Sequence, residues 1–313
     1  MLAERVDRLA AGHYTITSIP EDVARYAEVP DTLPVGSPGK VGVLDLTFER
    51  RSGRTELTGH YQKAPLQIMR PLYYDPARPD LPYVIVMSSG GGMLQGDRYR
   101  LDLACGADAS VHLTTQAATK IYRMEQDYAS QLVTITAGPG GYVEYLPDPV
   151  IPFAESRFYQ RTRVTCDPTA TVILGETLLA GRLAHGERHA YTAYCNDLEV
   201  CGPGGELLFA DPIRLVPGRA PVAGPAMIGA HGVLSTLYVV TSAVDAAELA
   251  DALHEAAAGS GLVGGASTLP NRAGAWARLL GPESPHVNAT LERLWDIARR
   301  AITGTPAPDR RKP

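Results

Sequence analysis

Three pairs of strand-forming segments, repeated along the middle of the chain, constrain the fold more than any other feature of the sequence. In each pair, two stretches of alternating β-forming residues flank a short turn rich in Gly, Pro or Asp, and the pairs cover residues 98–115, 131–146 and 156–176. We interpret each pair as a β-hairpin. The second strands of the pairs begin near residues 110, 142 and 171, which is a spacing of about 30 residues.

A hairpin that recurs at a fixed spacing cannot bury its own apolar face, so each copy has to stack on its neighbours. The sequence therefore predicts a mainly β fold of stacked antiparallel β-hairpins or sheets. This fold is either solenoid-like or an ordinary sandwich, and the sequence separates the two poorly. Residues 41–50, Tyr83–Met87 and Val233–Thr241 predict further strands by their alternating or continuous apolar patterns.

Helical patterns are confined mainly to the C-terminal part. Residues 245–258 and 286–302 place apolar side chains at helical spacing, and glycines follow both segments. We therefore expect one domain over residues 41–304, with β layers at 41–243 and a helical cap at 245–303. Residues 1–40, interrupted by four prolines, predict a peripheral and partly mobile segment, and residues 305–313 a frayed tail.

Composition excludes several classes of protein. The 313 residues are 45% hydrophobic and 20% charged, which is typical of a globular chain, and the net charge of -5 does not favour nucleic acid as a partner. The N-terminus lacks the apolar region of a secretory signal, and prolines and glycines interrupt the uncharged stretch at 220–244, which disfavours a membrane helix. We expect a cytoplasmic protein with no nucleic-acid or membrane partner.

The glycine-rich loop Ser88–Asp97 follows a predicted strand, where a phosphate-binding loop would lie. It does not match G-x-G-x-x-G, it has no Gly-Lys-Ser/Thr ending, and another strand follows it instead of a helix. We therefore interpret this loop as a tight structural turn. The chain also lacks G-x-S-x-G and C-x-x-C motifs, so the residues alone predict no catalytic site and no disulfide framework.

The most metal-like cluster is His185, Glu187 and His189. On an extended chain these three side chains would face one side and could bind nickel or zinc, although the spacing is not that of an H-E-x-x-H zinc site. Two interpretations stay open for this cluster. It is either a solvated surface or the centre of a small metalloenzyme built on a β scaffold.

Four blocks of sequence carry a resemblance to a known family. They are SSGGGMLQGDRYRLDL (88–103), HLTTQAATKIYRME (112–125), YVEYLPDPVIPFAESRF (142–158) and GETLLAGRLAHGER (175–188). In order and approximate spacing they resemble the urease accessory proteins of the UreD family, which is also called UreH. The similarity covers most of the chain except residues 1–40. The loop at 90–97 departs from the Ala-Gly-Gly-Leu-Val-Gly-Gly-Asp pattern of many members, with no evident functional consequence.

The resemblance implies an assembly factor and not an enzyme. Members of the family dock with UreF and the GTPase UreG on the urease apoprotein and help to install its two nickel ions. A water-filled passage through UreD has been proposed as the nickel route, and the family fold is mainly β with C-terminal helices. We therefore expect no tightly bound cofactor, transient nickel at most, and UreF, UreG and urease apoprotein as partners. A purely structural adaptor that stabilises UreF without contacting the metal is the alternative within this class.

A nickel conduit should use weakly held oxygen and imidazole ligands, because a cage of thiolates would trap the ion. Within the family blocks, five residues supply such ligands and are our candidate nickel-transit groups: Asp97, Glu144, Glu176, His185 and Glu187. The other motif residues are expected to shape the backbone and pack the fold. They are Gly90, Gly91, Gly92, Gly96, Thr115, Gln116, Lys120, Pro147, Pro152, Gly181, Arg182 and Gly186.

Overall fold

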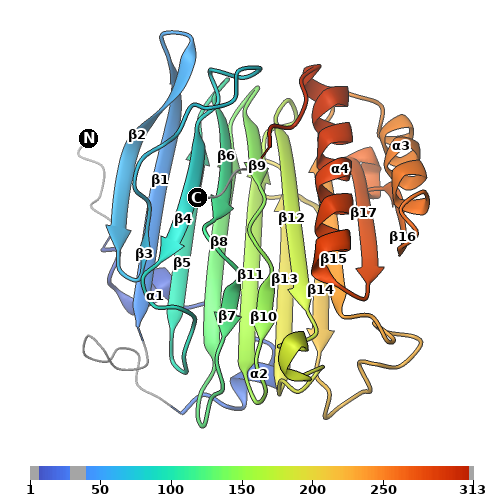
Figure 1. The fold of residues 1–313 in the computed structure, drawn as a ribbon. Coiled ribbons are helices and arrows are strands. Elements are labelled where there is room, and N and C mark those ends of the chain that lie inside the picture. The colour runs from blue at the N-terminus through green and yellow to red at the C-terminus, as the bar shows by residue number, and fades with distance from the viewer. Residues whose placement is uncertain (1–6, 29–39, 310–313) are drawn as a thin grey trace.

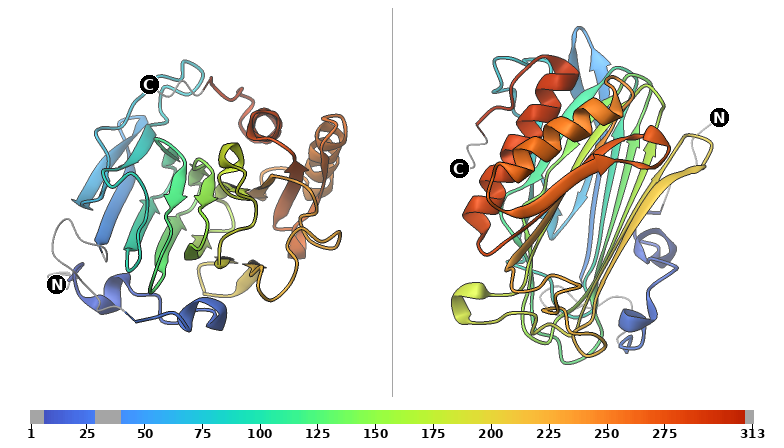
Figure 2. Two further views of the ribbon diagram at one scale, coloured as in Figure 1. Left: turned by 60° about the horizontal axis from the view of Figure 1, so that its bottom comes forward. Right: turned by 90° about the vertical axis from the view of Figure 1, so that its right-hand side faces the viewer.

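Two large β-sheets packed face to face form the centre of the molecule, and helices cover part of both outer sides (Figures 1 and 2). The computed structural model describes residues 7–28 and 40–309. Alternating burial along the strands explains the two layers, because a strand with one apolar face has to bury that face against a second sheet.

The seven-stranded sheet has the order β14-β13-β11-β8-β5-β1-β2. Its strands are β1 (Val41–Arg51), β2 (Arg54–Lys63), β5 (Arg98–Cys105), β8 (Ala129–Ala137), β11 (Arg157–Cys166), β13 (Ala193–Cys201) and β14 (Leu207–Leu215). The ten-stranded sheet has the order β16-β17-β15-β12-β9-β6-β4-β3, with β7 and β10 beside this path. Its strands are β3 (Leu66–Gln67), β4 (Tyr83–Ser88), β6 (Ser110–Thr115), β7 (Thr119–Ile121), β9 (Tyr142–Tyr145), β10 (Val150–Pro152), β12 (Thr171–Leu179), β15 (Val233–Val240), β16 (Val263–Thr268) and β17 (Gly274–Gly281).

Each repeat contributes one strand to each sheet. β5, β8, β11 and β13 are parallel neighbours in one sheet, and β6, β9 and β12 are parallel neighbours in the other. This arrangement confirms the mainly β, stacked and solenoid-like fold. The hairpin interpretation of the pairs is wrong, because β5 and β6, β8 and β9, and β11 and β12 lie in opposite sheets. A Gly- or Pro-rich turn can close a hairpin or turn a corner between layers, so the local sequence does not distinguish the two.

Two long helices cover the outer face of the ten-stranded sheet near β15 and β17, as the right-hand view of Figure 2 shows. They are α3 (Ala246–Ala258) and α4 (Ser284–Thr303), and both confirm predicted helices. The Asp245 side chain accepts hydrogen bonds from the Ala247 and Glu248 amides and so caps α3. The segment that we predicted as a helical cap also contains β16 and β17, which form one edge of the ten-stranded sheet.

The N-terminal residues 7–28 lie on the outer face of the seven-stranded sheet (Figure 2). They include the short helices α1 (Ala11–Tyr14) and α2 (Glu21–Ala24), and the buried Ile16 and Val23 pack against Tyr159. The rest of the predicted peripheral segment, at 1–6 and 29–39, and residues 310–313 of the predicted tail lie outside the described residues. Within the described parts of the chain, no helix combines the length and apolar character that crossing a membrane requires.

The space between the two sheets has an apolar end and a polar end. At the apolar end, Leu103, Ile135 and Val164 of the seven-stranded sheet face Val111, Val143 and Val172 of the ten-stranded sheet in one continuous core. At the other end, the inner faces of the same strands carry hydroxyl, amide and carboxyl groups. A second apolar core, which includes Leu237, Leu253 and Leu294, fills the space between the ten-stranded sheet and the helices α3 and α4.

Candidate functional site

A row of polar side chains crosses the inner face of the seven-stranded sheet. Tyr99, Gln131, Gln160 and Asn196 are register partners on β5, β8, β11 and β13. We call these four residues the polar row. Tyr99, Gln160 and Asn196 are 4%, 9% and 1% exposed, so most of the row is withdrawn from solvent. Polar groups this deeply buried need partners inside the protein or ordered water between the sheets.

Glu176 of β12 faces the polar row from the ten-stranded sheet. Its Oε2 atom accepts a hydrogen bond of 2.9 Å from Nδ2 of Asn196. The surrounding protein disfavours the charged carboxylate, and this desolvation raises the pKa of Glu176 to about 7; the Asn196 hydrogen bond opposes the rise, and the charge of Asp211 adds to it. Among the described residues, Oδ1 of Asn196 has no hydrogen-bond partner. At the Glu176 end of the row, the Asn196 Oδ1 atom is therefore an acceptor that a water molecule or a cation could bind.

Three cavities that share lining residues lie around Glu176. The Glu176 cavity has a volume of about 30 Å³ and is lined by Gln131, Gln160, Thr162 and Glu176 among others. The loop cavity, of about 320 Å³, lies at the glycine-rich loop and shares Gln131 with the Glu176 cavity. The α4 cavity, of about 340 Å³, lies beside Asn288 of α4. The loop cavity and the Glu176 cavity thus lie along the polar row, and the α4 cavity lies beside α4 on the other face of the ten-stranded sheet.

Asp97 lies at the Tyr99 end of the polar row. Its carboxylate accepts backbone hydrogen bonds from Lys40 at 2.8 Å and Leu94 at 2.9 Å, and the hydroxyl of Tyr99 donates to it at 3.3 Å. Burial raises the pKa of Asp97 above its ordinary value, and these hydrogen bonds oppose the rise. The structure thus places Asp97 and Glu176, two of the predicted transit groups, at opposite ends of one row.

Glu144 faces the other way, toward α4. It is fully buried, and Nδ1 of His112 lies 2.7 Å from its Oε2 atom. Its Oε1 atom accepts hydrogen bonds from the Tyr142 hydroxyl at 2.6 Å and the Trp295 indole at 2.9 Å. Burial by itself would raise the pKa of Glu144, but His112 and the charge of Arg299 hold it below its ordinary value. Glu144 is therefore an ionised and fully engaged carboxylate.

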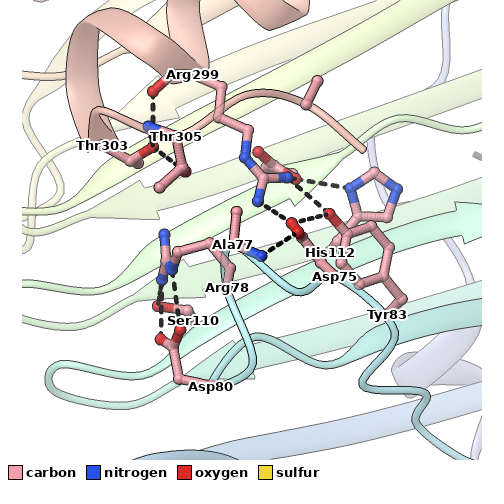
Figure 3. A network of polar contacts seen from close by, with 12 residues as sticks. Asp75, Ala77, Arg78, Asp80, Tyr83, Ser110, His112, Arg299, Thr303 and Thr305 are labelled. Atoms are coloured by element: carbon pink, nitrogen blue, oxygen red, sulfur yellow. Dashed lines mark hydrogen bonds and ion pairs between the residues drawn. The ribbon is translucent and has the colours of Figure 1, made fainter. Parts of the chain in front are cut away.

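Arg299 of α4 completes this group of buried charges, shown in Figure 3. Its guanidinium donates to the Tyr83 hydroxyl at 2.6 Å and to Asp75, and lies 3.6 Å from Glu144. We call Asp75, Tyr83, His112, Tyr142, Glu144, Trp295 and Arg299 the α4 ionic cluster. Its members join α4 to the ten-stranded sheet and to the loop before β4. These buried hydrogen bonds and ion pairs hold α4 against the ten-stranded sheet, which is a structural role.

The segment that contains His185, Glu187 and His189 is a turn and not an extended strand. Residues Leu183–His185 form a single 3-10 turn, and Gly186 follows with φ of 74°. The Glu187 carboxylate is engaged by the Arg182 guanidinium and the Ala154 amide. The extended geometry that the metalloenzyme alternative required is therefore absent here. Within residues 7–28 and 40–309, no three His, Cys, Asp or Glu side chains are grouped as ligands of one metal ion.

Two glycines of the motif blocks, Gly92 and Gly181, lie where the chain passes close to other backbone. A Cβ atom on Gly92 would lie 2.7 Å from the Lys120 carbonyl oxygen and from the Tyr122 ring. A Cβ atom on Gly181 (φ 148°) would lie 2.8 Å from the Glu187 carbonyl oxygen. The remaining motif residues lie near the cavities or the adjoining strands. Gly91, Thr115, Gln116 and Lys120 line the loop cavity, Pro147 lines both the Glu176 cavity and the α4 cavity, and Pro152 lies in β10.

Gln131, Gln160 and Asn196 are not among the residues predicted from the sequence. A signal for them exists in the strand pattern, because each occupies an inward position on a strand whose inward residues are otherwise mainly apolar. In β8, for example, Gln131 shares its face with Val133 and Ile135. An amide at the same inward position of three successive strands is detectable once the inward face is known. That face follows from the pairing of the strands.

Comparison with known proteins identifies the class of protein to which this β fold belongs. Residues 40–313 match the family model described as UreD urease accessory protein. A urease accessory protein UreD 2 of Streptomyces griseus is 56% identical over 293 residues, which cover 93% of this chain and 100% of the relative. The corresponding UreD 2 of Brucella suis is 38% identical over 92% of this chain and 96% of its own length. UreD of Haloarcula marismortui is 40% identical over 89% of this chain and 92% of its own length.

The chain belongs to the UreD family of urease accessory proteins. An accessory role in urease maturation follows from this membership.

Proposed function

We propose that this chain is a nickel-insertion scaffold: it binds the urease apoprotein and UreF and, with the GTPase UreG, enables assembly of the dinuclear nickel centre. In this proposal the chain performs no catalysis of its own. The supporting observation is the polar row and the cavities along it, within a chain that belongs to the UreD family. A protein that only stabilised its partners would gain nothing from buried polar groups beside empty space, because such groups cost free energy.

The chemistry of the row suits transient passage of nickel as cargo. Its groups are phenol, amide and carboxyl oxygens, which hold a divalent ion weakly compared with thiolates. The buried thiols of Cys105 and Cys166 lie at the apolar end, where burial raises their pKa to about 12 and about 11 and keeps them protonated. Nickel on this path would therefore meet oxygen ligands that can release it.

Among the candidate transit groups, the proposal concentrates on Glu176 and Asp97, which lie at the ends of the row. Glu144 has hydrogen bonds or ion pairs at both carboxylate oxygens, and Glu187 is held by Arg182. A cation could bind to either of them only by displacing these partners. His185 lies in the 3-10 turn after β12 and is not among the described residues that line the Glu176 cavity.

The test measures nickel per active site in urease purified from cells that express the whole urease operon, with and without this chain. We expect nickel-poor, inactive urease only when the chain is absent, and normal loading in both cases would contradict the proposal. A chain with Glu176→Ala should then load less nickel while still binding its partners. Glu187→Ala is the matched control, because it removes a carboxylate that is already paired, and we expect it to load urease normally.

A further inference from the structure

The main paths of the two sheets end, within the described residues, in four edge strands that differ in how they are protected. β2 carries charged side chains, β14 contains Pro212 and two charged residues, and β3 is two residues long. Charge, proline and short length each hinder the pairing of a further strand. β16 (Val263–Thr268) is six residues long and contains neither a charged residue nor a proline. It is therefore the edge most open to a further strand.

The open side of β16 is accessible. Val263 is 58% exposed, and Gly264 at the next position is also exposed. The Ala266 amide donates a hydrogen bond of 3.3 Å to Nδ1 of His254 on α3, so a side chain and not a strand is its acceptor there. This hydrogen bond is long, and the His254 side chain is exposed. An incoming strand that displaced His254 would replace one weak hydrogen bond with a ladder of them.

The helix beside this edge is acidic. α3 packs against β16, and its sequence contains no Lys or Arg. Glu248, Asp251 and Glu255 are all exposed and lie three or four positions apart, so they share the solvent-facing side of the helix. Asp251 lies one turn before His254 and Glu255 directly after it, which places both carboxylates close to the side chain that contacts β16. A partner that carries Lys or Arg complements this charge.

The same charge disfavours a second copy of this chain as the added strand. Antiparallel pairing of two β16 strands about a two-fold axis would place both α3 helices on the same face of the joined sheet. Two acidic helices would then face each other, and like charges across an interface oppose the contact. An extended segment rich in Lys or Arg meets no such repulsion.

We infer that β16 is a strand-addition site for an extended, basic segment of a partner protein: the segment's backbone extends the ten-stranded sheet, and its Lys or Arg side chains lie beside the acidic side of α3. This inference rests on the proposed function, since the partner is sought among the proteins of the maturation complex. β16 lies at the opposite end of the sheet from β3 and β4, which line the loop cavity. A segment bound at β16 therefore leaves the loop cavity open.

The first test measures backbone hydrogen–deuterium exchange in the full chain, alone and with UreF, UreG and urease apoprotein added separately and together. We expect a partner to slow the exchange of the β16 amides about tenfold or more, because new ladder hydrogen bonds protect them. The edge strand β2 is the internal reference, and its exchange should not change. Absence of protection at β16, or equal protection of both edges, would overturn the inference. Protection of β16 that rises with the concentration of the chain alone would also overturn it, by identifying a second copy as the occupant.

The second test reverses charge beside the edge. In a double variant with Asp251→Lys and Glu255→Lys, we expect the affinity for the protecting partner to fall about tenfold at physiological salt, and the difference to shrink at about 1 M salt. Glu49→Lys is the matched control, because Glu49 is exposed on β1, next to the far edge of the other sheet, and it should bind like the wild type. Wild-type affinity in the double variant would overturn the basic segment. Normal nickel loading of urease without the chain would instead overturn the proposed function.

Discussion

Two enclosed glutamates on opposite faces of one sheet show how neighbours decide what a buried acid can do. Glu144 on β9 and Glu176 on β12 lie in strands that pair directly with each other. Glu144 faces α4, where His112, Tyr142, Trp295 and Arg299 engage both of its oxygens, and its pKa lies below the ordinary value. Glu176 faces the cavity between the sheets, accepts one hydrogen bond from Asn196, and has a pKa of about 7.

The comparison teaches that burial alone does not identify a functional acid. A carboxylate whose two oxygens both accept hydrogen bonds or ion pairs stabilises the fold. Removing it leaves its buried donors and cations without a partner. A carboxyl group with few partners beside a cavity can lose its proton or its hydrogen bond and bind a cation instead, with little loss of folding stability. Mutation of Glu144 should therefore lower the stability of the fold, and mutation of Glu176 should lower the nickel loading of urease.

The largest expected effect is on the α4 ionic cluster. Arg299→Met leaves Asp75 and Glu144 as buried charges without their cation, so we expect a loss of about 3–5 kcal/mol in the free energy of unfolding by urea. Arg300→Met is the control, because Arg300 is exposed and its ion pair is with Asp296 of the same helix; this variant should cost less than about 1 kcal/mol. Equal losses in the two variants would contradict a stabilising role for the α4 ionic cluster.

The second effect is the contribution of Glu176 to the pH dependence of stability. Because its pKa is raised from 4.5 to about 7 in the folded state, the folded chain binds the proton more tightly than the unfolded chain. At about 1.4 kcal/mol per pH unit, this group lowers the stability by about 3 kcal/mol as pH rises from 4.5 to 7.

Glu176→Gln should remove this slope, which urea unfolding between pH 5 and 8 will measure. Glu144 has the opposite sign, because its lowered pKa means that its contribution is lost only as pH falls below about 4.5. Glu144→Gln should therefore leave the slope between pH 5 and 8 in place. A variant with Glu176→Gln that kept the wild-type slope would show that another group titrates.

The third effect separates stability from function at a single pH. At pH 5, Glu144→Gln should cost about 2 kcal/mol, because it removes an ionised acceptor from three donors, while Glu176→Gln should change stability by less than about 1 kcal/mol. Nickel loading of urease should fall with Glu176→Gln alone. Normal loading by that variant, or a loading defect in a folded Glu144→Gln chain, would reverse the assignment of the two residues.

The smallest effect concerns single donors around Glu144. Tyr142→Phe removes one hydrogen bond of 2.6 Å to its carboxylate and should cost about 1 kcal/mol in thermal or urea unfolding. Tyr145→Phe is the comparison three positions further along β9, where the side chain lines the Glu176 cavity. We expect Tyr145→Phe to lower the free energy of unfolding by less than Tyr142→Phe does. A larger loss would show that the hydroxyl beside the cavity makes the stronger hydrogen bonds.

Local patterns determined much of this molecule. Alternation along residues 98–176 specified strands and their spacing, helical periodicity specified α3 and α4, and the motif blocks specified the family. These features depend on residues close to one another in the chain, so short-range physics is enough to find them. The candidate list from the same blocks included Glu144 and Glu176 together, with nothing in either segment to separate them.

Only the tertiary structure decided which sheet each strand joins and which way each acid faces. The turns after β5, β8 and β11 cross between layers, which places strands about 30 residues apart side by side and brings Gln131, Gln160 and Asn196 into one row. Arg299 reaches Asp75 and Glu144 across 224 and 155 residues of chain. Such contacts arise from the packing of distant segments, and a side chain's partners, and with them its charge and its role, follow from that packing alone.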